Sequence, residues 1–366
     1  MDKQTKIYAE HLEDSALEQF NSAMEQEFAI KGALMPDAHT GYSLPIGAVV
    51  ASDGVVVPAW VGYDIGCGMC ALPTSFESND VTANSEEIFN EIYKKVPVGF
   101  NVNQHPVDCH LNPDDLSDLG RKAFEDRKGF RALGSLGGGN HFIEIGKDEE
   151  SKIWVIIHSG SRGVGHGIAT EYMRLASGTQ KILEGHHGLR VDDDAGRGYI
   201  NDMNWALEFA LANRKEMMRR IVGAISAYCD GGADWGKLIN RNHNHAEEKD
   251  GMWIHRKGAT HAEEGMMGVI PGNMRDGSFI VEGKGNPDAL WSSSHGAGRV
   301  LGRKQAKREL KTEDFQATMR GITARVEDST LDESPMAYKD IFEVMRLQAD
   351  LVNVCQHVTP IVNVKG

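Results

Sequence analysis

The chain has 366 residues, of which 40% are hydrophobic and 25% charged, and its net charge is −14. A chain of this size and composition can bury a large core without disulfides. The negative charge argues against broad, non-specific binding of nucleic acid, although it leaves room for a local basic groove. Lys and Arg do cluster at 127–131, 219–220 and 299–311, and each cluster could equally be a solvated helix face.

Cysteine usage and the N-terminus indicate the compartment. The five cysteines, an odd number, are spread through the chain and predict a reducing environment without a disulfide framework. The first residues lack the apolar core of a signal peptide, and no apolar run is long enough to span a bilayer. We therefore expect a cytoplasmic protein with no membrane association.

Apolar spacing predicts the helices and strands in chain order. Helices are predicted at 12–30, 85–95, 112–127, 199–228 and up to about 311, and strands at 54–61, 152–158 and 278–281. Residues 35–50 are predicted to be a loop running into a strand, and 159–166 a loop of small residues. Two more helices and a polar tail are expected to close the chain. No repeat or linker marks a boundary, so we expect one domain over 1–366 of class α+β (irregular α/β), with mixed β-sheets surrounded by helices and a central metal cleft.

The stretch at 61–71 organises the candidate site. Asp64 and Cys67 lie three residues apart on a glycine-rich turn, so a carboxylate and a thiolate can reach one ion or two neighbouring ions. Four histidines recur at strand or loop ends among small residues, and they are His141, His158, His243 and His295. Each one alone is more often structural. Together with the carboxylate and thiolate, they suit a borderline divalent ion such as Mn²⁺, Zn²⁺ or Fe²⁺.

A histidine beyond those that the metal needs could act as a nucleophile. His295 is followed by Gly296, Gly298 and Arg299, which leave space and positive charge for a phosphate. A neutral imidazole can attack phosphorus and form a covalent phosphoramidate.

Several familiar motifs match only in part. Residues 231–237 fit the start of a P-loop, but Leu238 stands where Ser or Thr must bind magnesium. The pair Cys67 and Cys70 has no second CxxC for a zinc ribbon. His-Ala-Glu occurs at 245–247 and at 261–263, but the Pro-Cys-x-x-Cys half of a nucleobase deaminase signature is absent.

Taken in order, the remaining motifs resemble those of the RtcB-type RNA ligases from about residue 35 to the C-terminus. The shared motifs are Pro36–Gly41, Asp64–Gly68, Gly137–Glu144, His158–Gly163, His243–Asn244, His255–Ala259, Ser294–Arg299 and Val364–Gly366. The resemblance implies a GTP- and Mn²⁺-dependent enzyme that joins an RNA 3′-phosphate or 2′,3′-cyclic phosphate to a 5′-hydroxyl, in RNA repair or tRNA splicing. An archease-type activator is a further partner that the resemblance suggests.

The resemblance also implies a role for individual residues. Cys67 would bridge two manganese ions, with His158 and His243 completing one site and Asp64 and His141 the other. His295 would become guanylylated and pass GMP to the RNA 3′-phosphate, and Asp37 matches a catalytic aspartate. Guanylate would be bound by Asn140, Glu144, Asn244, Ser278 and Lys365, with Asn273 standing where the family has a serine. Arg162 and Arg299 would hold phosphates.

Two other classes remain open. A metal-dependent phosphodiesterase or phosphatase acting on RNA 3′ ends could use the same metal site, because a cyclic phosphate must be hydrolysed there. A non-catalytic RNA- or metal-binding homologue is the third class. The presence of His295 and of the residues that would face guanine favours the ligase, since a plain hydrolase would not need them.

Overall fold

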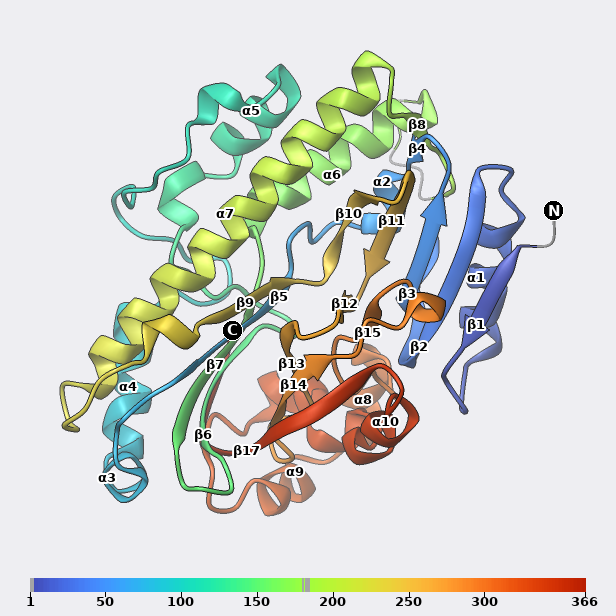
Figure 1. The fold of residues 1–366 in the computed structure, drawn as a ribbon. Helices are drawn as coiled ribbons and strands as arrows, with labels where there is room; N and C mark the ends of the chain where they lie inside the picture. Colours follow the sequence, from blue (N-terminus) through green and yellow to red (C-terminus); the bar gives the residue numbers. More distant parts are fainter. Residues whose placement is uncertain (1–2, 180, 182–184) are drawn as a thin grey trace.

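The computed structural model of the protein describes residues 3–179, 181 and 185–366 (Figure 1). Its largest sheet has eight strands in the order β13-β14-β17-β6-β7-β5-β9, with β16 beside β17. These strands are β5 (Gly68–Pro73), β6 (Phe142–Lys147), β7 (Ile153–Ser159), β9 (Ile239–Asn242), β13 (Met267–Pro271), β14 (Ser278–Gly283), β16 (Thr323–Ala324) and β17 (Val352–Lys365). The sheet is mixed, because β16 runs parallel to β17 while the other pairs are antiparallel.

A second sheet has five strands in the order β1-β2-β3-β11-β10. Its members are β1 (Gln4–Ile7), β2 (Ala29–Tyr42), β3 (Leu44–Ser52), β10 (Asn244–Lys249) and β11 (Met252–Lys257). Two short pairs complete the strands: β4 (Val55–Val56) with β8 (Leu189–Arg190), and β12 (Ala259–His261) with β15 (Ser292–Ser294). The predicted α+β class is confirmed.

Helices surround the sheets, as Figure 1 shows. The α-helices are α1 (Asp14–Glu25), α2 (Pro58–Val61), α3 (Ser78–Ala83), α4 (Ser85–Lys95), α5 (Asp118–Asp126), α6 (Arg162–Ser177), α7 (Asp194–Ile225), α8 (Arg303–Glu309), α9 (Thr312–Thr318) and α10 (Ile341–Leu347). Short 3₁₀ turns are η1 (Pro113–Asp115), η2 (Gly129–Ala132), η3 (Trp235–Lys237), η4 (Pro287–Ala289), η5 (Asp328–Glu333) and η6 (Pro335–Ala337). Within the described residues, no helix combines the length and apolar character needed to cross a bilayer.

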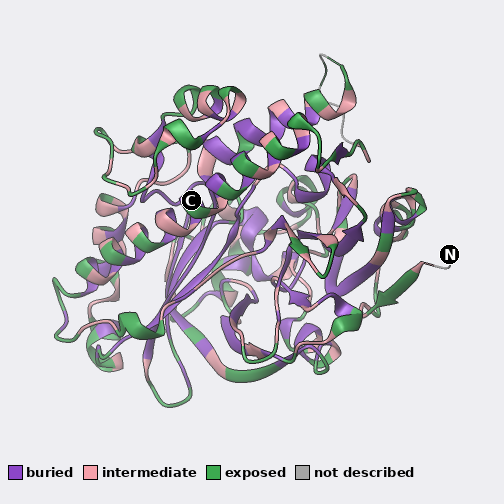
Figure 2. Cartoon of the chain, turned by 45° about the horizontal axis from the view of Figure 1, so that its top comes forward, coloured by how far each residue is buried: buried purple, intermediate pink, exposed green. Residues whose placement is uncertain are grey.

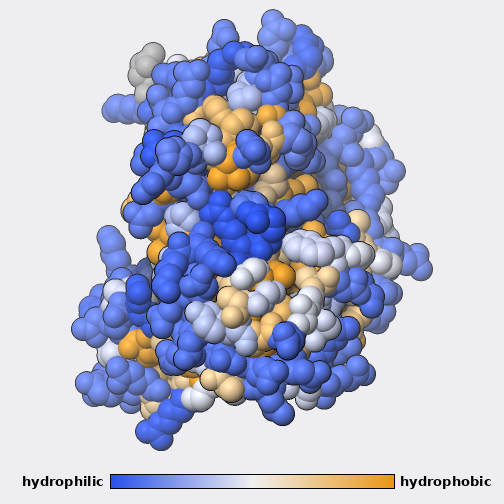
Figure 3. Space-filling view, turned by 90° about the vertical axis from the view of Figure 1, so that its left-hand side faces the viewer, coloured by the Kyte–Doolittle hydropathy of each residue, from blue (hydrophilic) through white to orange (hydrophobic). Residues whose placement is uncertain are grey.

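One cluster of the hydrophobic core lies between the large sheet and the helices α4 and α7. The central strands are buried along most of their length (Figure 2). Ile157 of β7, Ile221 of α7 and Ile92 of α4 belong to one cluster of fully buried side chains. The outer surface is largely polar, and the face in Figure 3 carries a hydrophilic band between two groups of hydrophobic residues. All five cysteines are free thiols.

Four predicted elements are wrong, and two of them lie within the first 61 residues. Residues 54–61 form the short β4 and then one helical turn, because Pro58 at the first helical position has its φ preset for a helix. The loop predicted from residue 35 is the second half of the long strand β2, whose register shifts after Leu34 and again after His39. These irregularities let the Gly- and Pro-containing motif pair with β3.

The other two corrections concern α6 and β17. The small-residue stretch after His158 enters helix α6 at Arg162 instead of remaining a loop. Its glycines permit close packing, since a Cβ on Gly167 would lie 2.9 Å from the Ala123 Cβ. The expected polar tail is strand β17, which pairs with both β6 and β14. Partly exposed residues at its start hid the buried half that follows.

Truncation of the core should separate buried from exposed positions. Ile157→Ala removes a fully buried side chain and should lower the free energy of unfolding by about 2–5 kcal/mol. Ile7→Ala, at a residue 45% exposed on β1, should change it by less than about 0.5 kcal/mol. Denaturant titration of both variants measures this, and equal effects would contradict the placement of β7 in the core.

Candidate active site

Five potential metal donors converge from four separate segments. The Cys67 Sγ lies 3.1 Å from the His158 Nε2 and 3.4 Å from the His141 Nε2. The His243 Nε2 lies 3.2 Å from the His158 Nε2. The Asp64 Oδ2 lies 3.1 Å from the His141 Nε2. The structure therefore brings together all five residues for which the sequence predicts metal binding.

The backbone fixes the orientation of two of these imidazoles. The Nδ1–H of His141 donates to the Leu136 carbonyl at 3.0 Å, and that of His158 donates to the Asn140 carbonyl at 3.1 Å. With Nδ1 used in this way, the lone pair is on Nε2, which points into the cluster. Metal-binding histidines in proteins are held by the same type of outer hydrogen bond.

Burial makes this cluster suited to a cation. It lowers the pKa of His158 and of His243 well below the ordinary value, so both imidazoles are neutral at physiological pH. It also raises the pKa of the Cys67 thiol, which a bound cation would reverse. One thiol, three imidazoles and a carboxylate form a donor set that fits a borderline divalent ion.

Two adjacent residues of α7 hold these segments in place. The wholly buried Arg214 donates from Nη1 to the carbonyls of Gly66 and Ser159, both at 2.8 Å. Its Nε and Nη2 donate at 2.6 Å to the side chains of Asn240 and Asn242. Gly66 precedes Cys67, Ser159 follows His158 and Asn242 precedes His243, so one guanidinium joins three donor segments. Burial lowers its pKa to about 10, which leaves it charged at neutral pH.

Asn213 performs the same task for the glycine-rich segment that leads to His141. Its Oδ1 accepts from the backbone nitrogens of Gly134 at 2.7 Å and Ser135 at 3.1 Å. Its Nδ2 donates to the Gly160 carbonyl at 3.0 Å. The glycine-rich turn is thus tied to the end of β7 through α7.

A further histidine, His295, lies beside the donors. Its ring is 4.8 Å from that of His243, centre to centre, and its Nδ1 is 2.7 Å from the Asp37 Oδ2. The same oxygen accepts from the backbone nitrogens of His295 and Gly296. Burial alone would raise the pKa of Asp37, but the adjacent His295 outweighs it and holds that pKa below its ordinary value. An ionised Asp37 fixes the proton on Nδ1 and leaves Nε2 as the nucleophilic nitrogen.

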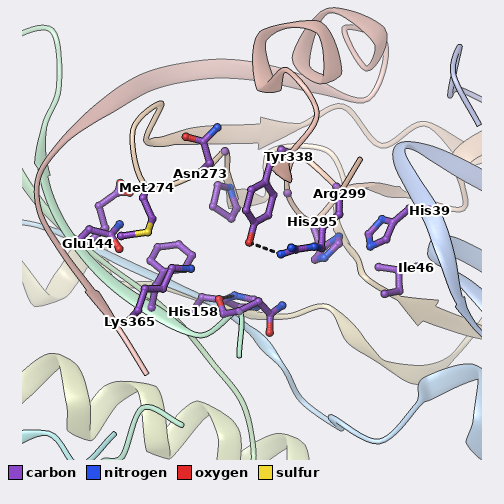
Figure 4. Close-up of a pocket in the computed structure, with 18 of the residues that line it drawn as sticks. His39, Ile46, Glu144, His158, Asn273, Met274, His295, Arg299, Tyr338 and Lys365 are labelled. Carbon is purple, nitrogen blue, oxygen red and sulfur yellow. Dashed lines mark hydrogen bonds between the residues drawn. The ribbon is translucent and has the colours of Figure 1, made fainter. Parts of the chain in front are cut away.

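His295 faces a cavity of about 290 Å³ (Figure 4). Among the residues that line the cavity are Asn140, Phe142, Glu144, Asn273, Arg299 and Tyr338. Lys365, at the end of β17, lies at the lower left of the lining residues in Figure 4. Its size and its mixture of aromatic and polar groups suit a nucleotide-sized ligand.

Glu333 holds the charged wall of this cavity. Its Oε2 lies 2.6 Å from the Lys365 Nζ and accepts from the Tyr338 hydroxyl at 2.7 Å, while its Oε1 lies 2.5 Å from the Arg303 Nη1. Arg299 reaches the same carboxylate at 3.4 Å. Burial alone would raise the pKa of Glu333, but Lys365 and Arg303 outweigh it and lower that pKa to about 2.

Comparisons with known proteins identify the family. The family described as tRNA-splicing ligase RtcB matches residues 19–126 and 114–366. RNA-splicing ligase RtcB of Escherichia coli strain K12 is 36% identical over 391 residues, which cover 97% of this chain and 95% of that protein. The chain belongs to the RtcB family. The tRNA-splicing ligase RtcB of Pyrobaculum aerophilum is 30% identical over 403 residues, which cover 85% of this chain and 82% of the relative.

The RtcB resemblance predicts six guanylate-binding residues besides His295, and four of them line the cavity: Asn140, Glu144, Asn273 and Lys365. Ser278 lies next to the Glu144 carboxyl behind the lining. Asn244 does not line it, because its side chain donates to the Asp64 carbonyl and accepts from the Gly258 nitrogen.

The two arginines that the RtcB resemblance assigns to phosphate lie on different sides of the site. Arg299 lines the cavity. Arg162 lies outside it, with its Nη1 3.5 Å from the His141 Nδ1, on the side of the donors that faces Asp64. A phosphate held by Arg162 therefore approaches the donors from a different direction than one held by Arg299.

Sequence reasoning missed Arg303, Tyr338 and Asn363, which line the cavity, and Glu333 behind them. Arg303 lay within a basic cluster that could equally have been a solvated helix face. Arg303 is the first residue of α8 and directly follows Gly302, and this position could have distinguished it from the other basic residues of 299–311. The other three have no spacing that connects them to the histidines.

A second group of potential donors lies outside this site. Ligand atoms of His245, Glu247 and His261 lie within 4.8 Å of one another. However, the wholly buried Arg256 donates from Nη1 to the Glu247 Oε1 at 2.5 Å and to the His245 Nε2 at 3.2 Å. A guanidinium already stands where a metal would bind, so this group is a buried charge network.

Removal of the thiol should disrupt metal binding specifically. Cys67→Ala should lower the bound Mn²⁺ or Zn²⁺, measured by elemental analysis after dialysis, by at least about 10-fold, because it deletes the donor that contacts both His141 and His158. Cys70→Ala is the matched control, since Cys70 is equally buried but packs in the core away from the donors. Equal metal loss in both variants would contradict the assignment.

Glu144 should make stability depend on pH. Burial raises its pKa from 4.5 to about 8, so between those pH values the folded protein holds a proton that the unfolded chain has released. The free energy of unfolding should therefore fall as pH rises across this window, by up to roughly 1.4 kcal/mol per pH unit. Glu144→Gln should remove this component. Urea titrations at pH 5, 6, 7 and 8 test it, and parallel curves for both proteins would refute it.

Proposed function

We propose that this protein is an RNA ligase that joins an RNA 3′-phosphate or 2′,3′-cyclic phosphate to a 5′-hydroxyl through a histidine–GMP intermediate, in RNA repair or tRNA splicing. Membership of the RtcB family supports ligation. The observation that supports the intermediate is the position of His295, which lies between the buried donors and a nucleotide-sized cavity while Asp37 holds its Nδ1.

The nucleotide in this proposal is GTP, bound in the cavity that Figure 4 shows. Guanine carries adjacent N–H donors that can pair with Glu144 once its carboxyl has released the proton that burial retains. Among the described residues, its Oε1 has no hydrogen-bond partner. Lys365, which the Glu333 carboxylate holds, supplies positive charge near the Glu144 carboxyl. Arg299 and the backbone around Gly296 and Gly298 lie where the phosphates would extend.

In the proposed reaction, the His295 Nε2 attacks the α-phosphate of GTP. A nitrogen–phosphorus bond forms, and the bond to pyrophosphate breaks. A 2′,3′-cyclic phosphate is first opened by water, which breaks the bond to the 2′-oxygen and leaves a 3′-phosphate. The RNA 3′-phosphate then attacks the same phosphorus, which releases the histidine and gives the RNA a GMP leaving group. Finally the 5′-hydroxyl attacks the 3′-phosphorus, forms the phosphodiester and expels GMP. In each step, the Asp37 carboxylate stabilises the proton on Nδ1 of the His295 imidazole.

Two Mn²⁺ ions complete the proposal. Cys67 would bridge them, with His158 and His243 on one ion and Asp64 and His141 on the other. Bound manganese supplies charge neutralisation for the phosphoryl groups. The chain's own contribution is to keep the imidazoles neutral through burial and to aim their Nε2 atoms inward.

Covalent labelling tests this function. The protein incubated with α-³²P-GTP and Mn²⁺ should retain label on a denaturing gel, and His295→Ala should lose it because the nucleophile is absent. His110→Ala, at an exposed histidine, is the control and should label normally. Failure of the wild type to label when metal is bound, even with an archease-type activator added, would contradict the ligase. Hydrolysis of a cyclic phosphate would then favour the phosphodiesterase.

A further inference from the structure

One large hydrophobic residue near the site is fully exposed. Phe100 has a relative accessibility of 102%, the highest among the large hydrophobic residues that the described chain exposes. A phenylalanine in water forgoes the roughly 1.5–3 kcal/mol that burial would contribute to folding. A methyl group built on the neighbouring Gly99 would meet nothing within 4 Å, so the space beside this residue is also open.

The turn that carries Phe100 is nevertheless firmly anchored. The Asn101 nitrogen donates to the Val98 carbonyl, and the Gly99 nitrogen donates to the Gly137 carbonyl at 2.8 Å. Beyond the turn, the Asn103 Nδ2 donates at 2.7 Å to the Arg131 carbonyl. An aromatic ring displayed on a backbone held at both ends is preorganised for binding, because little chain entropy is lost when a partner arrives.

The turn adjoins the open side of the metal donors. The Arg162 Nη2 donates to the Gly99 carbonyl at 3.2 Å, while its Nη1 lies 3.5 Å from the His141 Nδ1. The Asp64 side chain is 38% exposed, whereas Cys67 and the three donor histidines are buried. The donor cluster is therefore accessible to solvent at Asp64, and Arg162 links that opening to Phe100.

The other approach to the donors is through the cavity that His295 faces. In the proposed function that cavity holds the guanine nucleotide, so the RNA end must reach the donors from the side of Asp64 and Arg162. Unstacked bases at single-stranded ends are commonly recognised by stacking on aromatic side chains, with basic residues holding the backbone. Phe100 and Arg162, which bonds the carbonyl of the adjacent Gly99, provide these two groups.

We infer that Phe100 is a stacking platform for a nucleobase at the RNA end that enters on the Asp64 side, and so helps to position that end for ligation. The inference rests on the proposed function. The stacked base belongs either to the nucleotide with the 3′-phosphate or to the one with the 5′-hydroxyl. Every base has a face that can stack on an aromatic ring, so Phe100 would bind RNA ends without sequence specificity. It would favour an unpaired end, because a base within a duplex is already stacked on its neighbours.

Substitution of Phe100 tests the inference. Phe100→Ala should weaken binding of single-stranded RNA, measured by fluorescence anisotropy at one salt concentration, by roughly 5- to 100-fold. The KM for RNA should rise in proportion, and Phe100→Trp should restore both. Trp235→Ala, at a 41% exposed aromatic residue on η3, is the matched control and should change neither. Histidine labelling requires no RNA and reports separately on the proposed function.

An abasic RNA identifies the stacked base. A substrate without the base at its 3′-terminal nucleotide and another without it at the 5′-terminal nucleotide are each compared with the intact RNA. For one of these two abasic substrates, the wild-type protein should bind as weakly as Phe100→Ala binds intact RNA. Phe100→Ala should bind that abasic substrate no more weakly than the wild type does. The inference is overturned if Phe100→Ala binds intact RNA as tightly as the wild type does. It is also overturned if loss of the base and loss of the ring weaken RNA binding additively at both ends. Absent ligation with intact RNA binding would refute the proposed function alone.

Discussion

The candidate site depends on the pair Asn213 and Arg214 in the middle of α7. Arg214 is an always-charged group in a fully buried position, and such a group is tolerated only when its donors are satisfied. Here they are satisfied by the chain segments that carry Cys67, His158 and His243, while Asn213 bonds the segment that leads to His141. The cost of burying the guanidinium is thus offset only when the donor segments are in register. The packing of α7 against the large sheet and the assembly of the site therefore depend on the same contacts.

The donors could be predicted from the sequence, but the walls of the cavity could not. Asp64, Cys67, His141, His158 and His295 occur in short motifs that contain glycine, so their chemistry can be predicted without coordinates. Glu333 has no such context, because its role comes from three cations that the fold brings to it from distant positions. The same holds for β17, where partial exposure at the start masked a strand that pairs on both edges. The local sequence pattern therefore predicted the donor residues, whereas the residues that line the cavity together are decided by contacts between distant parts of the chain.

Polar atoms without partners mark where the site expects a ligand. Buried polar groups in proteins are nearly always hydrogen-bonded. The exceptions here include Oε1 of Glu144, Oδ1 of Asn363 and Nδ1 of His243, all at the cavity or the donor cluster. The cluster around Arg256 also contains such an atom, Nδ1 of His245, although Arg256 bonds Glu247 and the other ring nitrogen of His245. The difference between the two clusters is the guanidinium of Arg256, which bonds the donors of the second cluster.

The arrangement of the donors between two openings bears on how a two-substrate reaction can be ordered. His295 and the cavity lie on the side of His158 and His243, while Asp64 and Arg162 lie on the side of His141. A nucleotide attached to His295 would leave the Asp64 side open, so an RNA end could enter without displacing it. The phosphorus atoms of both substrates would then meet at the buried donors, where neutral imidazoles and low water content strengthen each electrostatic contact. A covalent histidine carrier is suited to this geometry, because it keeps the activated phosphorus beside the donors while the second substrate arrives from the opposite side.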